Sequence, residues 1–106
     1  MVWTTAFHSA AAVEFLAQPE DIQAKFERIQ NLVQLYGLER IPGKYAKHLR
    51  GPLWEFCLKG KDGIARALYV TKIGQRIVVV RVFAKKTEKT PRREIDLALT
   101  RAGEVD

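Results

Sequence analysis

Residues 77–86, with the sequence IVVVRVFAKK, constrain the fold more than any other part of the chain. Consecutive β-branched residues favour an extended strand, and residues 77–80 are apolar on both faces of that strand. Such a strand is expected to be central in a sheet and covered by helices on at least one side. Strict alternation predicts one face made of Val78, Val80 and Val82. The adjacent lysines Lys85 and Lys86 would then carry positive charge at the rim of the sheet.

The flanking sequence predicts the other elements of a small α+β domain. A helix over residues 19–37 is indicated by apolar residues at three- and four-residue spacing, and a loop rich in Gly and Pro is expected over residues 39–52. Ser9 and Thr90 are the expected N-cap residues of two further helices. The predicted strands are residues 1–7, 53–60, 64–73 and 77–86. The order β-α-α-β-β-β-α predicts one domain over residues 1–106, a small antiparallel sheet backed by helices.

Charge is distributed unevenly along the chain, whose formal net charge is +6. Residues 1–40 hold three basic and five acidic residues, a net charge of −2, whereas residues 41–106 hold fifteen basic and seven acidic residues, a net charge of +8. Such asymmetry suits a polyanion such as RNA or DNA. The alternative interpretation is a basic protein without a nucleic-acid role.

Several other classes of protein do not fit the composition. The single cysteine, Cys57, and two distant histidines offer neither a disulfide framework nor metal-ligand spacing, so we expect no metal and no cofactor. No apolar run reaches the ~20 residues that a membrane-spanning helix needs, and the start lacks the positive segment of a signal peptide. A cytoplasmic protein is therefore expected.

The candidate functional residues are cations at the ends of the predicted strands. Counting outward from a turn centred near residue 74.5 places Arg66 opposite about residue 83. The alternatives without a functional role are an ion pair between Arg66 and Glu55, and a solvated edge at Lys85 and Lys86. The candidate cations and the loop histidine are Lys44, Lys47, His48, Arg50, Arg66, Arg81, Lys85, Lys86 and Lys89.

These residue types suit RNA cleavage without a metal. A base takes the proton of the ribose 2′-OH, which attacks the adjacent phosphorus, and fixed cations stabilise the charge on the phosphoryl oxygens. Arginine holds two phosphate oxygens at once. Glu55 and His48 are the two candidate bases.

Three stretches together resemble the RelE/HigB-type toxins of bacterial toxin–antitoxin systems. They are KHLRGPLWEF (47–56), IARALYV (64–70) and IVVVRVFAKKTEKTPRREIDLALTR (77–101). FAKKTEKTP (83–91) resembles the phage-derived subgroup of this RelE/ParE superfamily in particular. The resemblance implies a RelE-like fold, similar to microbial ribonucleases. It also implies a metal-independent endoribonuclease that cuts mRNA on the ribosome and is silenced by a cognate antitoxin, in HigB-type systems a helix-turn-helix DNA-binding protein.

Carried over by the resemblance, Arg66 and Lys86 would stabilise the phosphoryl transition state. The base would be one of the two candidates named above, Glu55 or His48. The expected RNA-binding residues are Lys44, Lys47, Arg50, Arg81, Lys85 and Lys89. Two alternatives remain open: a gyrase-inhibiting ParE-like toxin, and a non-catalytic basic nucleic-acid-binding module.

Overall fold

The structure, a computed structural model, describes residues 2–105. Its elements follow the predicted order, with one 3-10 helix and one strand in addition. They are β1 (Thr4–Phe7), α1 (Ser9–Leu16), α2 (Glu20–Tyr36), the 3-10 helix η1 (Leu38–Arg40), β2 (Ala46–Arg50), β3 (Leu53–Lys59), β4 (Ile64–Lys72), β5 (Arg76–Ala84) and α3 (Arg92–Ala102). None of the helices within residues 2–105 is long and apolar enough to cross a membrane.

The sheet has the strand order β1-β5-β4-β3-β2, so β5 lies inside the sheet as its apolar sequence predicts. Strands β2 to β5 form an antiparallel meander, and the α+β class with a helix-backed sheet is confirmed. The sheet is not antiparallel throughout, because β1 pairs in parallel with β5 from Thr4 opposite Arg76 to Phe7 opposite Val79.

The prediction of a loop over residues 39–52 is wrong for Ala46–Arg50, which form strand β2. This strand lies at the edge of the sheet and pairs only with β3 among the strands of the described chain. Its side chains are mostly exposed and include Lys47, His48 and Arg50. An exposed edge strand needs no apolar alternation, so the sequence pattern that indicates a strand is missing here.

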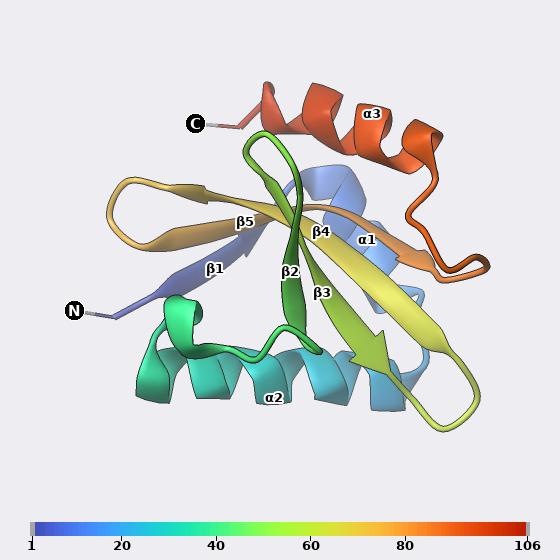
Figure 1. Ribbon diagram of the computed structural model, residues 1–106, viewed down its shortest axis with the longest axis horizontal. Helices are drawn as coiled ribbons and strands as arrows, with labels where there is room; N and C mark the ends of the chain where they lie inside the picture. The colour runs from blue at the N-terminus through green and yellow to red at the C-terminus, as the bar shows by residue number, and fades with distance from the viewer. Residues whose placement is uncertain (1, 106) are drawn as a thin grey trace.

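Helices cover both faces of the sheet (Figure 1). On one face, α1 and α2 pack against a buried cluster that includes Phe26, Phe56 and Tyr69. On the other, α3 packs through Ile95 and Ala98. Val79 belongs to the first cluster and Val80 to the second, so β5 is apolar because it is buried from both sides.

A β-bulge in the β4–β5 pair changes which residues of β5 face α3. Tyr69 lies opposite Val79 and Leu68 opposite Arg81, so Val80 is the additional residue. The predicted strict alternation is therefore wrong beyond Val80: Val82 lies in the α2-side cluster, and Phe83 joins Val80 on the α3 side. The predicted position of Arg66 is confirmed, because it lies directly opposite Phe83.

Both predicted helix caps are displaced by one residue. His8, rather than Ser9, is the N-cap of α1, and its Nδ1 accepts a hydrogen bond of 3.1 Å from the backbone N–H of Ala10. Pro91, rather than Thr90, is the N-cap residue of α3. The hydroxyl of Thr90 is thereby free to bind elsewhere.

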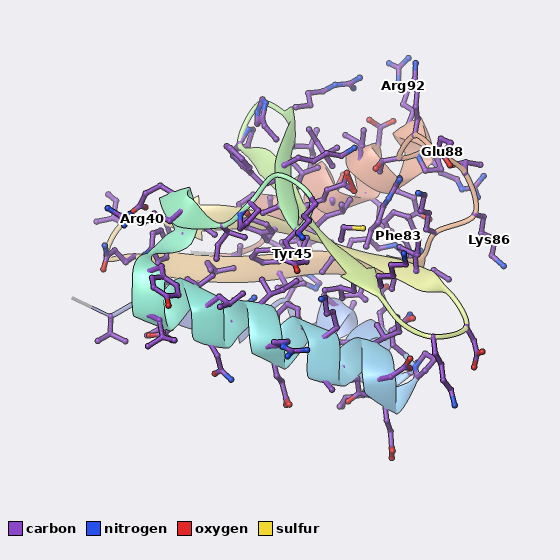
Figure 2. The ribbon with its side chains drawn as sticks, turned by 60° about the horizontal axis from the view of Figure 1, so that its bottom comes forward. Arg40, Tyr45, Phe83, Lys86, Glu88 and Arg92 are labelled. Atoms are coloured by element: carbon purple, nitrogen blue, oxygen red, sulfur yellow. The ribbon has the colours of Figure 1, made fainter. Side chains whose placement is uncertain are left out.

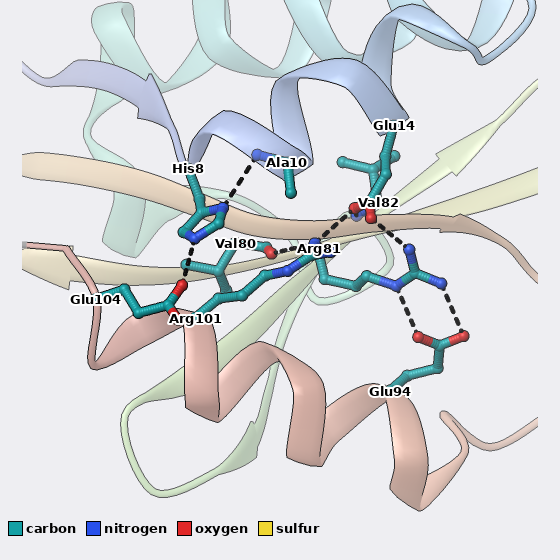
Figure 3. A network of polar contacts seen from close by, with 9 residues as sticks. All are labelled: His8, Ala10, Glu14, Val80, Arg81, Val82, Glu94, Arg101 and Glu104. Carbon is teal, nitrogen blue, oxygen red and sulfur yellow. Dashed lines mark hydrogen bonds and ion pairs between the residues drawn. The ribbon is translucent and has the colours of Figure 1, made fainter.

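A network of charged side chains joins α1, β5 and α3 (Figure 3). Glu14 on α1 pairs with Arg81 at 2.6 Å and with Arg101 at 2.9 Å, and Arg81 also pairs with Glu94 at 2.7 Å. The pairing of β1 with β5 ends at Val79, and beyond it side chains form hydrogen bonds to the backbone of β5. The N–H of Val82 donates to Glu14, and Arg101 donates to the carbonyl oxygen of Val80.

Candidate active site

A basic cavity of about 220 Å³ lies where β2, β3 and β4 meet the loop between β5 and α3. Its charged members come from four separate segments of the chain. It is lined by Gly43, Lys44, Tyr45, Ala46, Lys47, Glu55, Cys57, Arg66, Lys85 and Glu88. The antiparallel meander places these side chains together, because Lys47 lies opposite Glu55 and Cys57 lies opposite Arg66.

Glu55 and Arg66 form a buried ion pair at the floor of this cavity. Their exposed fractions are 1% and 4%, and Arg66 Nε lies 3.4 Å from Glu55 Oε1. The ion pair between Arg66 and Glu55, which the sequence offered as a purely structural alternative, is therefore present. Lys47 Nζ lies 3.5 Å from the other oxygen, Glu55 Oε2, and its side chain is 58% exposed. Glu55 thus connects a buried cation with one that reaches solvent.

The β5–α3 loop supplies further partners of Arg66. Its Nη1 donates to Thr90 Oγ1 at 2.8 Å, and its Nη2 donates to the carbonyl oxygen of Glu88 at 2.5 Å. Thr90 Oγ1 in turn lies 3.0 Å from Glu55 Oε1. A buried charge is tolerated only when it is paired and hydrogen-bonded. Two guanidinium nitrogens of Arg66 are hydrogen-bonded, and the third, Nε, faces the Glu55 carboxylate.

Lys85 and Lys86 have different surroundings although they are adjacent. The backbone N–H of Lys85 donates to the carbonyl oxygen of Ile64, which extends the β4–β5 ladder by one step. Its side chain lines the cavity and lies 3.8 Å from the carboxylate of Glu88. Lys86 is exposed and points away from the protein on the outer side of the loop (Figure 2).

The structure thus brings together five of the predicted site residues: Lys44, Lys47, Glu55, Arg66 and Lys85. The other five lie outside this cavity: His48, Arg50, Arg81, Lys86 and Lys89. Arg50 and Lys89 are exposed.

His48 lies on the opposite face of β2 from Lys47. It is paired with Trp54 of β3, and the centres of the two rings are 5.2 Å apart. Its Nε2 lies 2.8 Å from the carbonyl oxygen of Gly51. Of the two candidate bases, the geometry therefore leaves Glu55 beside the cations.

Arg81 belongs to the network of Figure 3 rather than to the cavity. Hydrogen bonds from its guanidinium to Glu94 raise the pKa of Arg81, although burial opposes this effect. Burial by itself would raise the pKa of Glu14, but hydrogen bonds from Arg101, the Val82 N–H and Arg81 lower it overall.

Two further polar residues, Tyr45 and Thr90, belong to the site, and of these Thr90 was not predicted as a site member. Tyr45 lines the cavity, and the ammonium groups of Lys25 and Lys44 lie 4.6 Å and 5.1 Å from its ring centre. Thr90 connects Glu55 and Arg66. The Thr-Pro pair at 90–91 was the one sequence signal for a role of Thr90, but the same pair indicates the start of a helix.

A larger cavity of about 340 Å³ lies near η1 and has a different lining. Its walls include Trp3, Leu38, Ile41, Trp54 and Tyr69, and Glu39 is its one charged member. This lining offers no cation to a phosphate. Within residues 2–105, no group of three or more His, Cys, Asp or Glu side chains is placed to hold a metal ion.

Comparison with known proteins gives a family match and two similarities of fold. A family model described as phage-derived protein Gp49-like matches residues 13–103. The structure is similar to a free, doubly mutated form of the E. coli toxin RelE, with a TM-score of 0.68 and 18% identity over 95% of this chain and 98% of that one. It is also similar to an archaeal RelE–RelB complex from Pyrococcus horikoshii, with a TM-score of 0.57 and 14% identity over 79% of this chain and 96% of that one. No curated protein matches the sequence.

Proposed function

Because the chain belongs to the phage-derived Gp49-like protein family and has a RelE-like fold, we propose that it is the toxin of a type II toxin–antitoxin system. In this proposal it is a ribosome-dependent endoribonuclease that cleaves mRNA without a metal ion. The observation that carries the proposal is the convergence of Lys44, Lys47, Arg66 and Lys85 around Glu55 in one cavity. The lining holds four cations and two carboxylates, Glu55 and Glu88, so it has an excess of positive charge that favours an anionic ligand.

The proposed reaction is attack of a ribose 2′-OH on the adjacent phosphorus. Glu55 takes the proton of the 2′-OH, the new bond from O2′ to phosphorus forms, and the bond from phosphorus to the 5′ oxygen breaks. The leaving 5′ oxygen receives a proton from an ammonium group of the cavity, for which Lys85 is our candidate. The products are a 2′,3′-cyclic phosphate and a 5′-hydroxyl.

The cations are proposed to have different roles in the reaction. All three nitrogens of Arg66 are already engaged by Glu55, Thr90 and Glu88, so Arg66 acts on the phosphoryl group through its charge in a site of low water content. Direct contact with phosphate oxygens falls to Lys44, Lys47 and Lys85, which line the cavity. Arg50, Lys86 and Lys89 are exposed and are proposed to bind the RNA backbone farther from the cut.

A cognate antitoxin is the proposed regulatory partner. Support comes from the archaeal structural relative, which is a RelE–RelB complex. From the resemblance to HigB-type systems, we propose that this antitoxin is a helix-turn-helix DNA-binding protein encoded beside the toxin. The proposed setting is the cytoplasm, where ribosomes and mRNA are found.

A translation assay with purified components tests the proposed enzyme. End-labelled mRNA is incubated with the protein, with and without ribosomes, and the cut positions are mapped. We expect discrete cuts that require ribosomes. Glu55→Gln should remove them because an amide does not accept the proton of the 2′-OH. Glu27→Gln makes the same change at an exposed position of α2 and should cleave like the wild type.

Two other outcomes would contradict the proposal. Intact mRNA together with inhibited DNA supercoiling would favour the gyrase-inhibiting alternative. Intact mRNA without toxicity on expression would favour a basic nucleic-acid-binding module.

A further inference from the structure

We propose that Thr90 is a positioning residue, whose hydroxyl fixes the Glu55 carboxylate and the Arg66 guanidinium relative to each other. This inference rests on the proposed ribonuclease function for its consequence, although the geometry is independent of that function. Thr90 belongs to the loop that precedes α3, and Pro91 follows it.

The chemistry of the three groups fixes the direction of both hydrogen bonds. A guanidinium only donates, so the oxygen of Thr90 accepts from Arg66 Nη1 at 2.8 Å. An ionised carboxylate only accepts, so the hydroxyl hydrogen of Thr90 is directed to Glu55. The distances are 3.0 Å to Oε1 and 3.4 Å to Oε2. One hydroxyl therefore serves both charged groups at once, and neither bond can reverse.

This arrangement makes the two oxygens of Glu55 unequal. Oε1 is held by Thr90 at 3.0 Å and faces Arg66 Nε at 3.4 Å. Oε2 lies 3.5 Å from the ammonium group of Lys47, whose side chain is largely exposed. Oε2 is thus the oxygen beside the exposed lysine of the cavity, and it is the one that the proposed reaction would use as the base.

The backbone around Thr90 holds the hydroxyl in place. A residue before proline is restricted to extended conformations, which limits the freedom of Thr90. Pro91 is itself held at the start of α3, because its carbonyl oxygen accepts from the N–H groups of Glu94 and Ile95. The position of the hydroxyl is therefore set by packing of α3 on the sheet. A displacement of about 1 Å in a catalytic group costs on the order of 100-fold in rate.

Two substitutions separate the hydroxyl of Thr90 from its methyl group. Thr90→Val keeps the shape and removes the hydroxyl, whereas Thr90→Ser keeps the hydroxyl and removes the methyl group. We expect Thr90→Val to lower kcat for ribosome-dependent cleavage about 100-fold. KM should change less than threefold, since the lysines that bind the RNA are untouched. Thr90→Ser should stay within about threefold of the wild type. Thr87→Val, in the same loop, is the matched control, because Thr87 donates only to the carbonyl oxygen of Lys89 among the contacts described.

A second measurement does not depend on activity. Nitrogen-15 NMR of the arginine side chains reports how freely each guanidinium rotates. Separate Nη resonances for Arg66 are expected in the wild type, in Thr90→Ser and in Thr87→Val. In Thr90→Val they should merge, because a partner that restrains rotation has been lost.

The outcomes distinguish this inference from the proposed function. If the wild type never cleaves mRNA but the Arg66 resonances merge only in Thr90→Val, the ribonuclease proposal fails and the positioning of Arg66 by Thr90 stands. If Thr90→Val is folded, keeps separate Arg66 resonances and cleaves like the wild type, the inference is overturned. Loss of activity in Thr90→Ser with retention in Thr90→Val would also overturn it, since packing and not the hydroxyl would then matter.

Discussion

Glu55 and Arg66 are charged residues at positions where most proteins place apolar ones. Each is almost fully buried, and each depends on the other and on Thr90 to replace the water that it has lost. Removing one member of a buried pair leaves an uncompensated charge, which costs about 3–5 kcal/mol. Replacing both members with apolar residues is often close to neutral. The pair therefore makes the site rigid without adding much net stability to the fold.

A double-mutant cycle tests this interpretation. We expect Glu55→Met and Arg66→Met each to lower the free energy of unfolding by about 3–5 kcal/mol, and the double variant to lose much less than the sum. Urea unfolding gives all four free energies. The control cycle uses Arg92 and Asp96, an exposed pair at 3.9 Å on α3, whose coupling should be only about 0.3–0.5 kcal/mol. A coupling as small as this between Glu55 and Arg66 would contradict the prediction.

The residues of the site were predictable to different degrees. Arg66 was found because it interrupts an apolar strand, and simple counting from the turn placed it opposite Phe83. Thr90 was missed as a site residue because its contacts lie 24 and 35 positions away in the chain. Local sequence patterns describe neighbours within one element and carry no information on such long-range contacts.

At the scale of elements, the bulge in β5 decides which lysine enters the site. Tyr69 lies opposite Val79, whereas Leu68 lies opposite Arg81. The alternation of side chains along β5 is therefore shifted by one residue after Val80. Without this shift, the even-numbered residues would continue on the α3 face, and Lys86 would share a face with Arg66. With it, Phe83 and Lys85 are on that face. A bulge leaves no clear mark on a run of valines, so the sequence could not separate the two lysines.

The two lysines provide a matched pair of variants. We expect Lys85→Ala to lower kcat/KM for mRNA cleavage at least about 10-fold more than Lys86→Ala, since only Lys85 lines the cavity. Circular dichroism should show both variants folded, because neither side chain is part of the core. The opposite order of activities would mean that the loop rearranges when RNA binds.

At the scale of the whole molecule, Glu14 and Arg101 join segments 87 positions apart. Glu14 also binds Arg81, so a single carboxylate connects α1, β5 and α3. Its contribution to stability depends on its charge. Because the folded state lowers the pKa of Glu14 below the ordinary value of 4.5, this contribution is fully present above pH 4.5 and is lost as the pH falls through the lowered value.

Glu14→Gln should therefore change the response of the protein to acid. Above pH 4.5 we expect the variant to be less stable than the wild type by about 1–3 kcal/mol, since two arginines lose a charged partner. The difference should shrink as the pH falls further, because the wild type then protonates Glu14. Thermal unfolding between pH 7 and pH 3 measures it, with the exposed Glu27→Gln as the control. A difference that is independent of pH would contradict the prediction.

The long reach of these contacts also bears on the synthesis of the protein. Glu14 can pair with Arg101 only after 87 further residues have been made, and His8 with Glu104 only after 96. Arg66 likewise waits for Glu88 and Thr90 before its guanidinium is fully engaged. A nascent chain that ends before residue 90 therefore lacks part of the site, and α3 has not yet closed over the sheet. The order of translation thus delays assembly of the charged cavity until residues 88–90 have been made.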